Sequence, residues 1–115
     1  MEKVSNREVR SLVQARQQFE NKEGSLIGRE CADGLYAVFS YNWPLFIFYK
    51  GHWYGNNGKS TRTTSKHFGY AHPWKKLALR EDSQMRDLMN VAHARKMDKF
   101  KAAYNYPAAK VEKRG

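Results

Sequence analysis

"LYAVFSYNWPLFIFYKGHWYG", from Leu35 to Gly55, is the stretch of sequence that decides the fold. Its first seven residues alternate between two faces: one carries Leu35, Ala37, Phe39 and Tyr41, and the other carries Tyr36, Val38 and Ser40. This period of two, in residues that favour extended backbone, predicts a strand over 35–41. Asn42-Trp43-Pro44 predicts a turn, 45–50 the returning strand, and Lys50-Gly51 a second turn into a third strand over 52–55.

Helical patterns flank these strands on both sides. Ser5 and Glu8 have the spacing of a capping box, and apolar residues at helical spacing follow, which predicts a helix over 6–22. Thr63-Thr64-Ser65 offers hydroxyls that could cap a short helix ended by Pro73. From Glu81 the pattern is helical again and predicts a long helix to about Tyr104, stopped by Pro107.

These elements predict an α+β fold with an N-terminal helix, a three-stranded antiparallel sheet and a long C-terminal helix on one sheet face. The length of 115 residues suits one domain. We expect a single domain over 1–106 and a flexible basic tail over 107–115.

Charge is unevenly distributed along the chain, whose formal net charge is +10. Residues 1–33 hold six basic and six acidic side chains. Residues 34–80 contain no Asp or Glu but seven Lys or Arg, together with twelve of the sixteen aromatic residues. A basic, aromatic segment without acids suits a polyanion with stackable bases. A buried aromatic sheet with lysines at its edges would have the same composition.

The sequence favours a soluble protein of a reducing compartment. The longest mostly apolar run, 35–49, is shorter than the ~20 residues that a membrane span requires, and residues 1–11 lack an apolar signal region. Cys31 is the single cysteine and cannot form an internal disulfide. We therefore expect no membrane partner and a cytoplasmic location.

"GNNGKSTRTTSKH" (55–67) contains Gly58-Lys59-Ser60, which matches the end of a nucleotide-binding P-loop. A P-loop needs its first glycine five positions before the second, and Trp53 stands there. The pattern also needs a carboxylate for magnesium, which 34–80 lacks. The segment is therefore not predicted to bind a nucleotide.

Catalytic and metal-binding patterns are equally hard to assemble from this sequence. His67 and His72 lie five positions apart, and Cys31 has no second cysteine, so no zinc-ligand spacing emerges. The acids cluster in the two outer segments and form no obvious acid/base pair. We expect no enzyme activity, no metal and no cofactor.

One constellation does suit anion binding. Lys59, Arg62, Lys66 and His67 accompany four hydroxyl residues at the predicted start of a helix, where amides and hydroxyls bind phosphate well. Lys75, Lys76 and Arg80 would extend the positive surface if they share its face. Trp53 and Tyr54, with Trp43 and Trp74, are candidates for base stacking. The alternatives are a plain helix cap beside a charged loop, and aromatic residues that belong to the core.

The stretch from 36 to 67 resembles a module of small uncharacterised proteins of tailed bacteriophages. The matching features are a Tyr strand, an apolar strand, a Trp-Tyr strand and a closing "TTSKH". The matching positions are Tyr41, Trp53, Tyr54, Thr63, Thr64, Ser65, Lys66 and His67. The resemblance implies a phage origin, hence the cytoplasm of an infected bacterium, and a β-hairpin unit. It transfers no catalytic residue.

The first functional hypothesis is therefore a non-enzymatic nucleic-acid-binding protein that uses Lys59, Arg62, Lys66, His67, Lys75, Lys76, Arg80, Trp53 and Tyr54. The alternative is a phage-encoded modulator or inhibitor that binds an acidic surface of a host protein. A third hypothesis is a minor virion component. The sequence leaves open DNA or RNA, single or double strands, the oligomeric state and any host target.

Overall fold

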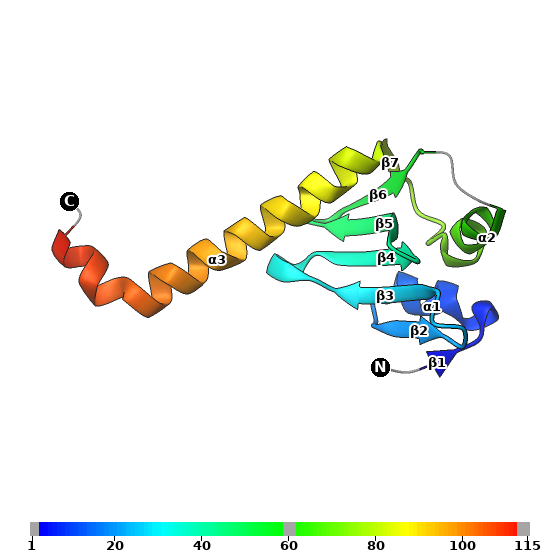
Figure 1. The fold of residues 1–115 in the computed structure, drawn as a ribbon, viewed down its shortest axis with the longest axis horizontal. Helices are drawn as coiled ribbons and strands as arrows, with labels where there is room; N and C mark the ends of the chain where they lie inside the picture. The colour runs from blue at the N-terminus through cyan, green and yellow to red at the C-terminus, as the bar shows by residue number, and fades with distance from the viewer. Residues whose placement is uncertain (1–2, 59–61, 113–115) are drawn as a thin grey trace.

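The computed structural model describes residues 3–58 and 62–112 and contains one mixed sheet with helices on both of its faces (Figure 1). The strands are β1 Lys3–Val4, β2 Phe19–Asn21, β3 Leu26–Glu30, β4 Tyr36–Ser40, β5 Trp43–Tyr49, β6 His52–Asn56 and β7 Ala78–Arg80. The α-helices are α1 Val9–Gln14, α2 Arg62–Ala71 and α3 Asp82–Glu112, and two short 3-10 helices are η1 Asn6–Glu8 and η2 Ala32–Gly34.

The sheet has seven strands, so the prediction of a three-stranded antiparallel sheet is wrong. The three expected strands are present as β4, β5 and β6, near the middle of a sheet whose spatial order follows the chain order. Neighbours from β2 to β6 are antiparallel, whereas β1 pairs with β2, and β6 with β7, in parallel. The crossover from β1 to β2 contains α1, and the crossover from β6 to β7 contains α2.

The prediction of a single helix over 6–22 is also wrong. The capping box is present, and the Glu8 carboxylate accepts the backbone N–H of Ser5 at 2.9 Å, but it opens η1 and α1, which end at Gln14. Arg16 then takes a left-handed conformation (φ 52°). The amides of Arg16 and Gln17 donate to the carbonyls of Val13 and Leu12, each at 2.9 Å. This is the Schellman pattern that ends helices, here with arginine where glycine is usual.

The alternation along 35–40 is confirmed by two separate cores, one on each face of the sheet. The core beneath α1 and α2 contains Val9, Val13, Phe19, Leu26, Tyr36, Val38 and Phe46. The core beneath α3 contains Leu35, Ala37, Ile47, Tyr49, Met85 and Ala92. The expected packing of the C-terminal helix on one sheet face is thus present, and two further helices cover the other face.

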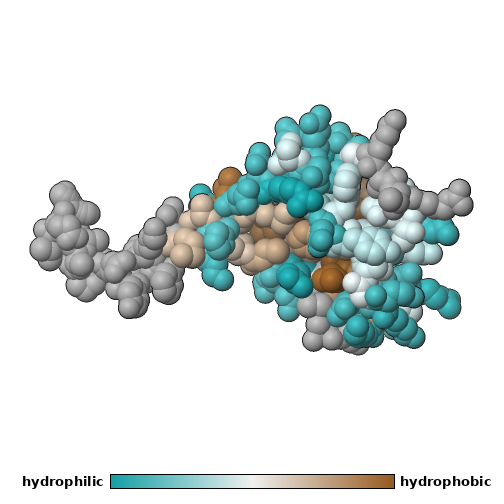
Figure 2. All heavy atoms as spheres, in the orientation of Figure 1, coloured by the Kyte–Doolittle hydropathy of each residue, from teal (hydrophilic) through white to brown (hydrophobic). Residues whose placement is uncertain are grey.

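Helix α3 begins at the β7 edge and projects well beyond the body of the molecule (Figure 1). The predicted end ahead of Pro107 is not observed, because α3 continues through Pro107 to Glu112. Figure 2 shows hydrophilic residues over most of the body, with apolar residues gathered in a narrower area toward the projecting helix. The division into a domain over 1–106 and a flexible tail stays a prediction.

The short helix predicted before Pro73 is confirmed as α2, which ends at Ala71. Thr63 and Thr64 lie in its first turn rather than ahead of it. Within the described residues, no helix combines the length and apolar character that crossing a membrane requires.

Candidate functional site: a basic groove at the β6–β7 edge

An open groove of about 550 Å³ lies where β7 joins the edge of the sheet. Parallel pairing of β6 with β7 begins only at Tyr54, which lies opposite Ala78. His52 and Trp53 come before this pairing begins, so they are not hydrogen-bonded to β7. The groove is the space between these two residues and the segment that leads into β7. Its main lining residues are His52, Trp53, Tyr54, Lys76, Leu77 and Arg80. Four of them, Trp53, Tyr54, Lys76 and Arg80, belong to the site predicted from the sequence.

The groove is positively charged. Lys76 and Arg80 are exposed, and no Asp or Glu is among its lining residues. Among the side chains that the structure describes, neither cation forms an ion pair. The Arg80 guanidinium carbon lies 5.6 Å from the centre of the Tyr54 ring, and one of its nitrogens donates to the carbonyl of Leu79 at 2.9 Å. Arg80 is therefore held beside an aromatic ring while its charge stays available to a ligand.

The two predicted aromatic residues have different roles in the groove. Trp53 is only 8% exposed, and its ring packs 5.0 Å from Phe48 and edge-on to Tyr36. Trp53 is therefore a core residue that also lines the groove, in agreement with the alternative that the aromatic residues belong to the core. Tyr54 is partly buried and offers more of its ring to solvent.

The predicted cradle around 59–67 does not gather at this groove. His67 is 4% exposed and points into the core, and Lys66 lies on the solvent side of α2, which contributes no residue to the groove. Lys59 and the side chain of Arg62 lie outside the part of the chain that the structure describes.

His67 takes part in a buried polar cluster that the sequence did not reveal. The hydroxyl of Ser40 lies 2.7 Å from Nδ1 of His67 and 3.1 Å from the hydroxyl of Thr64. Ser40 was expected only as one position of an alternating strand. Burial lowers the pKa of His67, so the neutral imidazole is favoured at this position. The cluster joins the end of β4 to α2.

Lys75 is exposed and lies between Lys76 of the groove and Trp74, whose ring is covered on one side by Arg10. Arg10 comes from α1, 64 positions earlier in the chain, so no local pattern could place it here. His52 lines the groove but was not among the predicted site residues, because an isolated histidine on a strand carries no motif.

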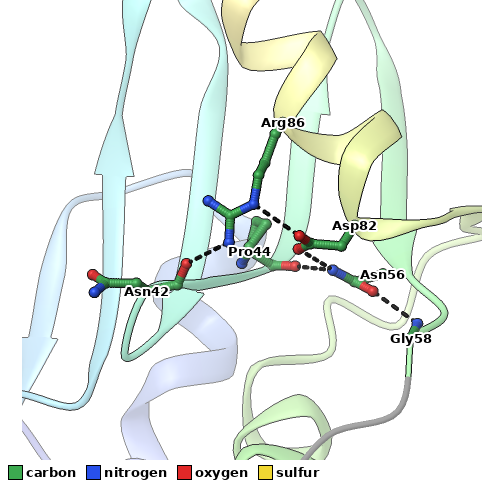
Figure 3. Close-up of polar contacts among 6 residues, drawn as sticks. All are labelled: Asn42, Pro44, Asn56, Gly58, Asp82 and Arg86. Carbon is green, nitrogen blue, oxygen red and sulfur yellow. Dashed lines mark hydrogen bonds and ion pairs between the residues drawn. The ribbon is translucent and has the colours of Figure 1, made fainter.

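A hydrogen-bonded network beside the groove joins the end of β6 to the start of α3 (Figure 3). The Asn56 side-chain amide donates to the Pro44 carbonyl at 2.9 Å and to Asp82 at 3.2 Å, and its oxygen accepts the Gly58 N–H. Arg86 donates to Asp82 at 2.8 Å and to the carbonyl of Asn42 at 3.1 Å. The charge of Arg86 is therefore paired, and the network holds the β7–α3 junction that carries Arg80.

Among the described residues, no group of three His, Cys, Asp or Glu side chains could hold a metal ion. Comparison of the chain with protein-family models, with curated proteins and with solved structures found no match. The resemblance to a phage module therefore stays a prediction.

Proposed function

We propose that this protein binds nucleic acid without catalysing a reaction, and that the β6–β7 groove holds the phosphodiester backbone. The observation that carries the proposal is the groove itself: it gathers Lys76, Arg80 and Tyr54 from two segments more than twenty positions apart and contains no acid. Lysine and arginine are the main phosphate-binding side chains, and an aromatic ring in the same groove suits the sugar or base.

The charge of the chain supports the same partner. The net charge is +10, and residues 34–80, which supply all the groove residues, contain no Asp or Glu. A polyanion approaching this edge therefore meets no carboxylate from the groove. Lys75 lies next to Lys76 in the chain and extends the positive surface beyond the groove, whereas Lys66 would supply a more distant contact from α2.

Fluorescence anisotropy with labelled single- and double-stranded DNA and RNA, at several salt concentrations, tests this function. We expect submicromolar binding near physiological salt, with a logarithmic salt slope of roughly 0.7 to 0.9 per phosphate contact. If binding vanishes by ~0.15 M salt, the charge supplies only generic attraction and the proposal is wrong. An acidic protein surface would then be the better hypothesis.

A pair of double variants tests the groove in particular. Lys76→Gln with Arg80→Gln removes its two cations, and Lys22→Gln with Arg29→Gln removes two exposed cations elsewhere while changing the net charge equally. We expect the groove variant to lose about tenfold or more in affinity and to have a smaller salt slope. The control should lose no more than about twofold to threefold. Equal losses for both variants would show that the groove has no special part in binding.

A further inference from the structure

Trp74 is an unusual surface residue, because a large apolar ring is held in solvent by a specific local structure. Its side chain is 70% exposed, and its backbone is left-handed, with φ of 56°. A non-glycine residue rarely adopts this conformation, since its Cβ crowds the backbone. Strain of this kind persists only where surrounding contacts impose it, and it is frequent at functional sites.

Those contacts come mainly from α1. Arg10 donates to the carbonyls of His72 (2.8 Å) and Gly69 (2.6 Å), and Gln14 donates to the carbonyl of Pro73 at 3.0 Å. The backbone N–H of Trp74 donates to Nδ1 of His72 at 2.9 Å. Three of these hydrogen bonds fix residues 72–74, which carry the indole, and two of the three are made by side chains of α1.

Arg10 also orients the ring itself. Its guanidinium carbon lies 3.7 Å from the centre of the Trp74 ring, at stacking distance, while two of its nitrogens bind the carbonyls named above. One face of the indole is thus covered by a flat cation. The 70% exposure of the side chain leaves the opposite face open to solvent. The result is a preorganised aromatic platform, with a positive charge behind it.

The charges around this platform indicate its occupant. Trp74 is followed directly by Lys75 and Lys76, and the second of these lines the groove. Two residues span at most about 7 Å of backbone, so the ring is attached close to the groove residue Lys76. Bases stack on aromatic side chains regardless of sequence, and only unpaired bases offer a free face, because duplex bases already stack on one another.

We infer that Trp74 stacks against an unpaired base, and that the protein takes single-stranded nucleic acid in preference to duplex. The inference rests on the proposed function: the groove binds the backbone, and the platform adds a contact that a duplex cannot make. Arg10 acts as a positioning residue that holds the ring.

Two variants test the inference in the full-length protein. Trp74→Ala removes the platform, and Trp74→Phe retains a smaller ring. Tyr70→Ala, at an aromatic residue of α2 that is 41% exposed, is the matched control. We expect Trp74→Ala to weaken binding of a ~20-nucleotide oligo(dT) by roughly tenfold, as loss of one stacked base implies. Trp74→Phe should lose less, and Tyr70→Ala should match the wild type.

The same variants are measured against a duplex of equal length, whose affinity should change by no more than about twofold. Oligo(dT) should also quench tryptophan emission in the wild type, and Trp74→Phe should reduce that quenching, with Trp43 and Trp53 remaining as emitters. A wild type that prefers duplex, or a Trp74→Ala variant that loses both ligands equally, would overturn the inference and leave the proposed function standing. A wild type that binds neither would refute the proposed function as well. Circular dichroism confirms that each variant is folded.

Discussion

The Ser40 hydroxyl and Nδ1 of His67 lie 2.7 Å apart in the interior, where they join the last residue of β4 to the middle of α2. Ser40 is fully buried and His67 is 4% exposed. A charged imidazole in this position would lose most of its hydration, and no carboxylate hydrogen-bonds to it in the described structure. The stability of this buried cluster therefore depends on a neutral histidine.

This dependence predicts a fall in stability at mildly acidic pH. Burial lowers the pKa of both His67 and His72 in the folded protein, so the unfolded chain binds more protons near pH 6. The free energy of unfolding should be constant above about pH 7.5 and decrease as pH falls through the ordinary histidine value of about 6.5. Urea denaturation between pH 7.5 and 5.5 measures the slope.

Replacement of His67 identifies its share of the effect. His67→Gln should reduce the dependence of stability on pH, whereas His93→Gln, at an exposed position of α3, should leave it as in the wild type. A wild-type stability that does not change over this range would contradict the buried, neutral histidine.

A second loss of stability is expected when Asn21, at the turn between β2 and β3, is replaced. Its side-chain oxygen accepts the backbone N–H of Ser25 at 2.8 Å and of Leu26 at 3.0 Å, and Asn21 is 1% exposed. Asn21→Ala leaves both buried donors without this acceptor. We expect a loss of about 3 kcal/mol, since an unsatisfied buried polar group costs about 1–3 kcal/mol. Chemical denaturation measures it, and Asn42→Ala, an exposed turn residue, should change stability by less than about 1 kcal/mol. Similar losses for the two would show that the turn does not need the Asn21 side chain.

Two glycine substitutions should have opposite effects. A Cβ at Gly28 would overlap the ring of Phe19 and the hydroxyl of Tyr36, both of them in the core, so Gly28→Ala should destabilise by about 3 kcal/mol or prevent folding. A Cβ at Gly69 in α2 has nothing within 4 Å, and alanine is the better helix former. Gly69→Ala should therefore stabilise by about 0.5–1 kcal/mol. Thermal denaturation of both variants checks the signs, and a Gly28→Ala protein as stable as the wild type would contradict the packing of β2 on β3.

The central strands could be predicted because their information is local. The alternation along 35–40 and the turn signals near 42 and at 50–51 identify β4, β5 and β6 without knowledge of the rest of the chain. The first turn was placed too late, because it lies at 41–42 and Trp43 and Pro44 already belong to β5. The outer strands carry no such signal. β1 has two residues and β2 and β7 have three each, too few to show a period, and they are strands only because a neighbour supplies hydrogen bonds.

The end of α1 and the groove could not be predicted, for two further reasons. Arg16 ends the helix in a conformation for which glycine is the usual marker, so 15–22 was predicted to be helical. The groove depends on the parallel pairing of β6 with β7, two strands that α2 separates in the chain. This pairing brings Lys76 and Arg80 near Tyr54 and leaves His67 outside the groove. The sequence could therefore name the basic residues of 34–80 as candidates, but it could not assign them to faces of the fold.

The anchoring of α3 gives the last prediction. Asp33, whose side chain is 6% exposed, accepts the Tyr49 hydroxyl at 2.6 Å and Nε of Arg95 at 3.2 Å, with Lys50 at 4.0 Å. These contacts tie α3 to the sheet just before the helix leaves the body. Asp33→Asn keeps a residue that tolerates the left-handed φ of 56° but removes the charge.

We expect Asp33→Asn to destabilise by about 1–2 kcal/mol, less than a fully buried pair would, because Arg95 and Lys50 are about half exposed. Hydrogen exchange should become faster in the part of α3 that packs on the sheet. The pKa of Tyr49, raised chiefly by its hydrogen bond to Asp33, should fall toward the ordinary value, which an absorbance titration against a Tyr49→Phe control detects. Glu20→Gln, which breaks the surface pair with Lys3, should cost under about 1 kcal/mol and leave exchange in α3 unchanged. Equal exchange in the wild type and Asp33→Asn would mean that apolar packing of Met85 and Ala92 alone holds the helix in place.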